Sequence, residues 1–216
     1  MTEAQLLLLR IPAIMIALTV HEYAHGYMAW LKGDNTAKVH GRLTLNPIAH
    51  LDIFGTLMLF FGPFGWAKPV PVNPINLDNP KRDMIYVGAA GPVSNIILAV
   101  FFGLIFRFIR WSPDFMSSSH LFIVFLQLCV LINLGLSFFN LLPIPPLDGS
   151  NILMGFLPAE KVGTYLKYAQ HAPKILFGLL LAEWVLHIPL FSTIIYPLWI
   201  PYMTFWQMII FGGRVI

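Results

Sequence analysis

Residues 6–31 read LLLLRIPAIMIALTVHEYAHGYMAWL, an apolar run of 26 residues that contains His21-Glu22-Tyr23-Ala24-His25. Before the first histidine, the run has no glycine and no charge other than Arg10. About 20 consecutive apolar residues are enough to cross the hydrocarbon core of a bilayer, so this run predicts a transmembrane helix. A cleavable signal peptide is disfavoured, because the positive charge lies inside the run and no small-residue cleavage site follows.

The composition of the whole chain agrees with a membrane protein. Of its 216 residues, 57% are hydrophobic and 11% are charged, with a mean hydropathy of +0.74. Soluble domains carry about a quarter charged residues. The net charge of +3 comes from Lys and Arg that are spread singly, which argues against a nucleic-acid partner. The single cysteine, Cys129, excludes an internal disulfide and is predicted to be a buried thiol.

Further apolar segments follow the first. Four are long, at about 84–109, 121–142, 173–189 and 191–212, and a shorter one at 52–64 contains two glycines and a proline. The short segment is predicted to be re-entrant or interfacial rather than spanning. The expected fold is therefore an all-α polytopic membrane protein of about five to six transmembrane helices. We expect one domain over residues 1–216, with its core at about 6–150 and accessory helices at 151–216.

The polar stretch between the first two full spans predicts a small membrane-associated β element. Residues 38–45 alternate apolar and polar side chains, which favours a short strand. The proline-spaced residues 69–74 predict extended chain. Near the other end, residues 155–172 carry apolar and charged side chains at helical spacing, which predicts an interfacial amphipathic helix.

Positive charges predict the orientation, provided that 52–64 does not cross. Ten Lys and Arg then lie on the side of the large loops, and three lie on the other side. Positive residues collect on the cytoplasmic side of membrane proteins, which places the large loops in the cytoplasm and the N-terminus outside.

The pattern His-Glu-x-x-His predicts a metal centre. Two histidines four residues apart lie one above the other on a helix, so both imidazoles can bind one ion. Glu22 would then hold and deprotonate the metal-bound water. Ionisable residues at the end of a membrane helix are costly unless they serve a site. The alternative is a cluster of polar residues that emerges from lipid at the interface.

A hydrolytic zinc site usually needs a third protein ligand, and Asp148 is the best candidate. It follows Pro143-Ile144-Pro145-Pro146-Leu147, whose prolines must break the preceding helix. Broken backbone at membrane depth is tolerated where it is buried or lines a watery cavity, which would bring Asp148 to such a cavity. Taken alone, however, Asp148-Gly149 after prolines is more typical of a surface turn.

Three separated motifs make the chain resemble the site-2 protease family of intramembrane metalloproteases. They are His21 to His25, Gly91-Pro92-Val93-Ser94-Asn95, and Asn140 to Gly149, and the similarity covers about residues 15–155. The likeness is to the small bacterial and archaeal members without PDZ or CBS domains. It implies that His21, His25 and Asp148 bind one Zn²⁺ and that Glu22 is the catalytic base.

The resemblance also places two asparagines, Asn95 and Asn140, near the site, where they would hold substrate or stabilise the oxyanion. An amide donates hydrogen bonds without a charge that must be desolvated. Helix packing is the alternative role of Asn95, and capping of the helix break is that of Asn140. Asn133 and Gln127 are expected to hydrogen-bond between helices.

The expected function is that of an intramembrane zinc endopeptidase that cleaves transmembrane segments with a Glu-activated water. The expected partners are a transmembrane helix of a substrate and the lipid bilayer, and a homo-oligomer is compatible with the sequence. We expect a multi-pass protein of the cytoplasmic membrane with its active site opening toward the cytoplasm. The alternatives are a membrane metal-binding or transport protein and a non-proteolytic scaffold. Glu183 and His187, four residues apart, favour a buried hydrogen bond over a second metal site.

Overall fold

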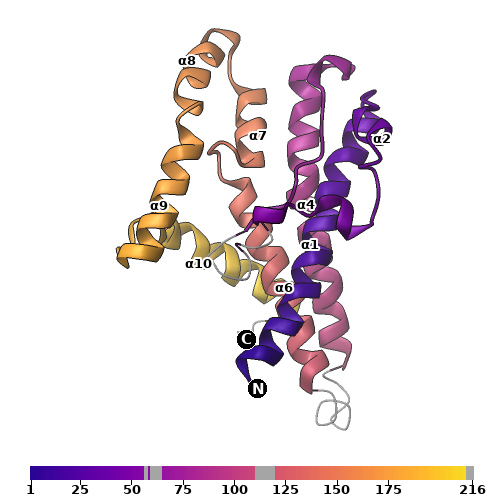
Figure 1. The fold of residues 1–216 in the computed structure, drawn as a ribbon, viewed down its shortest axis with the longest axis vertical. Helices are drawn as coiled ribbons and strands as arrows, with labels where there is room; N and C mark the ends of the chain where they lie inside the picture. Colours follow the sequence, from indigo (N-terminus) through magenta and orange to yellow (C-terminus); the bar gives the residue numbers. More distant parts are fainter. Residues whose placement is uncertain (56–57, 59–64, 110–119, 213–216) are drawn as a thin grey trace.

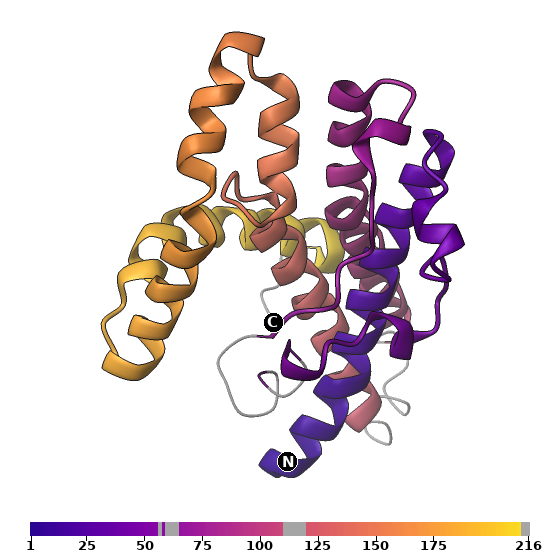
Figure 2. The ribbon, with the colours of Figure 1, turned by 45° about the horizontal axis from the view of Figure 1, so that its top comes forward.

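The computed structural model describes residues 1–55, 58, 65–109 and 120–212, and these residues are almost entirely helical (Figures 1 and 2). In chain order the elements are α1 (Glu3–Leu31), α2 (Thr36–Val39), η1 (Pro47–His50), η2 (Pro74–Asn76), α4 (Pro80–Ile109), α6 (His120–Leu141), α7 (Asp148–Phe156), α8 (Ala159–Ala169), α9 (Ala172–Leu186) and α10 (Leu190–Phe211).

Four of these helices, α1, α4, α6 and α10, are long and apolar enough to cross a membrane. This confirms the predicted class, an all-α membrane protein. The expected span at 173–189 forms α9, whose 15 residues give a length of about 22 Å, short of a hydrocarbon core of about 30 Å. The short segment at 52–64 lies largely outside the described residues. The expected count of five to six spans is therefore not confirmed.

Helices α1, α4 and α6 run side by side and form the centre of the molecule (Figure 1). The core between α4, α6 and α10 is built from buried apolar side chains, among them Ala99, Leu126, Val130 and Ile210. Helix α10 lies across the bundle rather than along it (Figure 1). Because α4 contacts α1, α6 and α7, it is the element around which the other parts of the site are arranged.

The predicted strand at 38–45 is wrong. Residues Thr36–Val39 form a short helical turn, and the β pairing within the described residues is a single bridge between Leu51 and Ala67. The reason is local: the buried carboxylate of Asp34 accepts hydrogen bonds from the backbone N–H and the hydroxyl of Thr36. Such side-chain bonds offer the backbone an alternative to strand pairing, and here they outweigh the alternating pattern.

The segment 65–73 forms no helix and lies along α1 (Figure 2). Proline fixes its own φ and keeps the preceding residue out of the helical region, which explains the extended course of residues 69–73; of the predicted stretch 69–74, Pro74 instead begins η2. The segment is tied down at both ends. Lys68 donates its N–H to the carbonyl of His50 at 2.9 Å, and Asn73 donates its N–H to Asp34 at 2.7 Å.

The predicted helix break lies between α6 and α7. Helix α6 ends at Leu141, and α7 begins at Asp148 after a series of turns. A Cβ on Gly149 would lie 2.3 Å from the carbonyl oxygen of Leu141 and 2.4 Å from that of Leu142. The start of α7 thus passes so close to the end of α6 that only glycine fits after Asp148.

Helices α7 and α8 run antiparallel and extend from one end of the molecule (Figures 1 and 2). The predicted amphipathic helix within 155–172 corresponds to α8, none of whose residues is buried. Glu183 of α9 accepts a hydrogen bond at 2.9 Å from the N–H of Ser192 in α10, and His187, in the turn between the two helices, has a left-handed backbone with φ of 54°. Among the described residues, this contact with the first turn of α10 takes the place of the expected Glu183–His187 hydrogen bond.

Candidate metal centre

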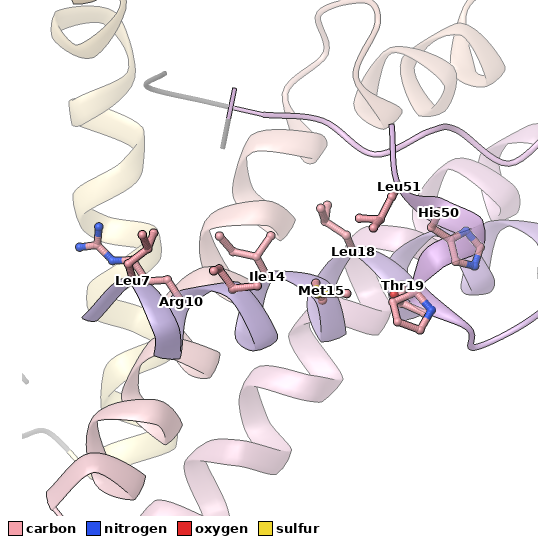
Figure 3. Close-up of a pocket in the computed structure, with 10 residues that line it drawn as sticks. Leu7, Arg10, Ile14, Met15, Leu18, Thr19, His50 and Leu51 are labelled. Carbon is pink, nitrogen blue, oxygen red and sulfur yellow. The ribbon is translucent and has the colours of Figure 1, made fainter. Parts of the chain in front are cut away.

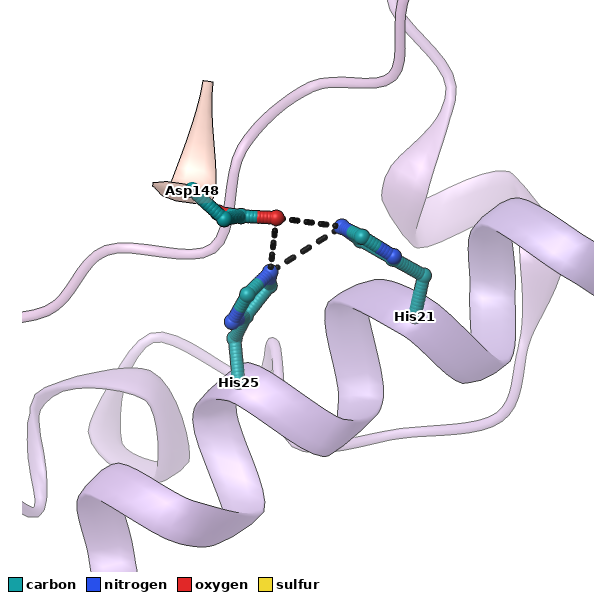
Figure 4. A group of neighbouring side chains, drawn as sticks. All are labelled: His21, His25 and Asp148. Atoms are coloured by element: carbon teal, nitrogen blue, oxygen red, sulfur yellow. Dashed lines mark hydrogen bonds and ion pairs between the residues drawn. The ribbon is translucent and has the colours of Figure 1, made fainter. Parts of the chain in front are cut away.

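His21 and His25 lie one turn apart on α1, and their rings meet the side chain of Asp148 at the start of α7 (Figure 4). The two Nε2 atoms are 3.0 Å apart. Oδ2 of Asp148 lies 3.1 Å from Nε2 of His21 and 3.2 Å from Nε2 of His25. Both histidines are buried, at 5% and 8% exposure. The structure thus brings together the three residues that the sequence suggested as ligands.

The other ring nitrogen of each histidine faces an acceptor on α4. Nδ1 of His21 lies 2.6 Å from Oδ1 of Asn95, and Nδ1 of His25 lies 2.7 Å from the carbonyl oxygen of Val87. A carbonyl oxygen accepts a hydrogen bond and cannot donate one, so each Nδ1 carries the hydrogen and each Nε2 presents a lone pair. Both lone pairs are therefore directed at the carboxylate of Asp148.

This geometry fits a zinc ion. Three acceptor atoms converge at 3.0–3.2 Å, and the buried Oδ2 of Asp148 receives no hydrogen bond from the part of the chain that the structure describes. Such an arrangement is repulsive unless a proton or a metal ion lies between the atoms. Ligand atoms at ordinary zinc distances in a tetrahedron are about 3.3 Å apart, close to the separations here. Two imidazoles and one carboxylate are also a common donor set of catalytic zinc, which leaves one position for water.

The close approach of the three helices depends on glycines on one face of α4. A Cβ on Gly91 would lie 2.4 Å from Nε2 of His25 and 2.7 Å from Nε2 of His21. A Cβ on Gly88, one turn earlier, would lie 3.1 Å from the carbonyl oxygen of Asp148. The absence of side chains at these two positions lets α1 and α7 meet over α4. Gly91 belongs to one of the motifs found in the sequence, but only the structure shows that it faces the two histidine rings.

Glu22 accepts a hydrogen bond at 2.8 Å from the backbone N–H of Val70, in the segment 65–73. This segment therefore passes next to the metal centre, and its backbone orients the carboxylate of the residue expected to be the base. The sequence did not identify the N–H of Val70 as a partner of Glu22, because every residue except proline carries a backbone N–H and the residue type does not show which one is used.

The two asparagines lie in different surroundings. Asn95 is fully buried, and its two amide hydrogens go to the carbonyl of Ala17 and to Oδ1 of Asn133. Its donors are thus used within the protein. Asn140 lies at the end of α6 and donates to the carbonyl of Leu136 at 3.0 Å, which uses one of its two amide hydrogens.

A cavity of about 200 Å³ runs along α1 on the N-terminal side of the histidines (Figure 3). Leu7 and Arg10 lie at one end and Thr19 and His50 at the other, and the wall between them is apolar. The cavity does not include the three ligand candidates. The site is therefore defined by the converging side chains rather than by this cavity.

Comparison with known proteins finds a matching family model and several relatives. A family model described as peptidase family M50 matches residues 113–182, which contain the helix break and Asp148. Two kinds of relative carry the name "Putative zinc metalloprotease": YwhC of Bacillus subtilis, and Rip2 of Mycolicibacterium smegmatis and Mycobacterium tuberculosis. No solved structure matches the chain.

YwhC is 44% identical over 147 residues, which is 67% of this chain and 67% of YwhC. Rip2 of M. smegmatis is 32% identical over 157 residues (68% of this chain and 56% of Rip2), and Rip2 of M. tuberculosis strain H37Rv is 32% identical over 176 residues (78% and 64%). The chain thus spans a little over half to two thirds of these relatives. On this similarity, and with zinc-type ligands converging between apolar helices, the chain belongs to peptidase family M50, the site-2 protease family of zinc metalloproteases.

Proposed function

We propose that the protein is an intramembrane endopeptidase that cleaves transmembrane segments of membrane proteins, with zinc held by His21, His25 and Asp148. The observation that carries this proposal is the convergence of these ligands from two helices, next to a carboxylate on Glu22. Bound zinc polarises the scissile carbonyl and lowers the pKa of a water toward about 7.

In this proposal Glu22 is the general base. It is the neighbour of His21 on α1, and the N–H of Val70 holds its carboxylate in one orientation. A carboxylate placed in this way takes the proton of the attacking water and returns it to the leaving amine. Asn140, at the end of α6, is proposed to donate its remaining amide hydrogen to the substrate backbone or the oxyanion.

The depth of the site supports a substrate within the membrane. His21 lies about 15 Å before the C-terminal end of α1, a helix long and apolar enough to span the bilayer. We place this end of α1 on the cytoplasmic side of the cytoplasmic membrane, from the excess of Lys and Arg in the loops that follow it. Water then reaches the site from the cytoplasm.

A helical substrate must unwind before it is cut, since its carbonyls are hydrogen-bonded within the helix. We propose that the segment 65–73 receives the unwound stretch by strand addition, because it is extended and passes beside Glu22. Spans that contain Gly or Pro should be preferred, since these residues weaken helices. A matched Gly→Leu change in a substrate span should slow cleavage, and equal rates would refute this part.

The test is cleavage of a panel of single-span substrates by the protein in proteoliposomes, with zinc content measured on the same sample. Glu22→Gln should retain zinc and lose cleavage, and a chelator should abolish cleavage in a way that added zinc restores. Zinc-dependent transport that survives Glu22→Gln, without proteolysis by the parent, would overturn the proposal.

A further inference from the structure

We infer that Asn95 and Asn133 form a relay of hydrogen bonds that fixes the tautomer and the orientation of His21, so that both are positioning residues of the metal centre. The inference rests on the proposed role of His21 as a zinc ligand. It gives Asn95 a role different from the substrate or oxyanion contact expected from the sequence.

The relay begins at a backbone carbonyl, which can only accept. The side chain of Asn133 on α6 donates from Nδ2 to the carbonyl of Cys129 at 2.8 Å. This bond fixes which end of the amide is nitrogen, so Oδ1 of Asn133 must face the other way. There it accepts a hydrogen bond of 2.8 Å from Nδ2 of Asn95 on α4.

The second amide is fixed in the same way. The other hydrogen on Nδ2 of Asn95 goes to the carbonyl of Ala17 on α1, at 3.1 Å. Since Nδ2 of Asn95 faces two acceptors, its Oδ1 is left to face His21, and it can only accept the Nδ1 hydrogen at 2.6 Å. The lone pair of His21 is thereby placed on Nε2, the atom 3.1 Å from Asp148. Neutral imidazole with the proton on the far nitrogen is the form that binds a metal.

Burial makes the relay stiff. Asn95 and Asn133 are both 0% exposed and lie between helices that are apolar around them. An unpaired buried polar group costs about 1–3 kcal/mol, which disfavours any rotation of either amide away from its partners. The relay also joins α1, α4 and α6 through side chains at the depth of the site.

His25 offers an internal comparison. Its Nδ1 is held by the backbone carbonyl of Val87, which no substitution removes. His21 depends on a side chain instead, so the orientation of one ligand can be perturbed while the other is left in place.

The experiment measures the zinc dissociation constant of the full chain in detergent, by competition with a chromophoric chelator, and the melting temperature of the metal-free protein. Asn95→Leu should weaken zinc binding about 10–100-fold, the range typical for loss of a group that orients a metal ligand. Asn133→Leu should weaken it by a smaller factor, because the carbonyl of Ala17 still orients Asn95. The double variant should bind zinc no more weakly than Asn95→Leu, because Asn133 acts through Asn95.

Val130→Ala is the matched control, since Val130 is a fully buried residue of α6 outside the relay. It should lower the melting temperature without changing zinc affinity. Unchanged affinity in Asn95→Leu, or independent additive losses in the double variant, would overturn the relay. His21→Ala distinguishes the proposed ligand set from the relay. If this variant binds zinc like the parent, the proposed ligand set fails. If it loses zinc while Asn95→Leu binds zinc normally, only the relay is refuted.

Discussion

Replacing Gly91 by alanine should remove zinc from the protein while leaving the fold intact. The added methyl would lie 2.4 Å from Nε2 of His25 and 2.6 Å and 2.7 Å from Cε1 and Nε2 of His21. Ordinary contact begins at 3.4 Å, so the methyl is about 1 Å too close to both rings. Relief requires α4 to move away from α1 or the two rings to turn.

Either movement damages the metal centre. A shift of α4 stretches the bonds that Asn95 and Val87 make to the two Nδ1 atoms, and a rotation of the rings separates the ligand atoms. Metal sites tolerate deviations of about 0.2 Å in ligand distance, far less than the 1 Å required. We therefore expect zinc affinity to fall by at least about 100-fold, since loss of one orienting contact alone costs about 10–100-fold. Overpacking should lower stability by about 1–3 kcal/mol.

The assay is zinc competition with a chromophoric chelator, together with thermal unfolding of the metal-free protein. Gly103→Ala is the control on the same helix, because its methyl would lie 2.0 Å from Cγ2 of Ile210, about 18 Å along α4 from Gly91. It should be destabilised to a similar degree and bind zinc normally. If Gly91→Ala binds zinc within about threefold of the parent, in the same assay, the close approach of α4 to the ligands is not what the structure implies.

Three further predictions test other contacts of the site and its surroundings. Val70→Pro removes the N–H that orients Glu22 and should lower kcat about tenfold or more at unchanged zinc content, because hydrogen bonds to charged groups contribute about 1.5–3 kcal/mol. Val72→Pro lies in the same proposed substrate-binding stretch but keeps the N–H of Val70, so it should raise KM and leave kcat nearly unchanged; an equal loss of kcat in both variants would contradict the role of the Val70 N–H. Gly149→Ala should disturb the start of α7, where a methyl meets two carbonyl oxygens at 2.3 and 2.4 Å, and should reduce zinc content; a fully loaded variant would contradict this. Burial alone would raise the pKa of the Asp34 carboxyl, but hydrogen bonds from Thr36, Asn76 and Asn73 outweigh burial and lower this pKa from its ordinary value of 3.8. The charged carboxylate therefore stabilises the folded protein above pH 3.8, and this stabilisation is lost as the pH falls through the lower pKa of the folded state. The difference in melting temperature between the parent and Asp34→Asn should thus narrow on acidification, and a constant difference would show that Asp34 does not titrate in this way.

Local patterns predicted much of the architecture. The apolar run at 6–31 became α1, and the prolines after Leu142 ended α6 before Asp148, because helix length and helix breaking depend on neighbouring residues. The strand at 38–45 failed for a related reason. The hydrogen bonds that Asp34 accepts influence the local backbone more strongly than the alternation of side chains does. The alternating pattern contains no information about these bonds.

By itself, the sequence determined that the protein is a helical membrane protein with two histidines on one helical face, since both properties follow from composition and the helical repeat. Resemblance to a family was needed to favour Asp148 as a ligand over a residue of a surface turn. Only the tertiary structure decided that this carboxylate lies 3.1 Å from His21, that Gly91 leaves room for both rings, and that Asn95 faces His21 with no donor left for a substrate. These contacts join helices far apart in the chain, and they depend on how the side chains of α1, α4, α6 and α7 pack together, which no local periodicity encodes.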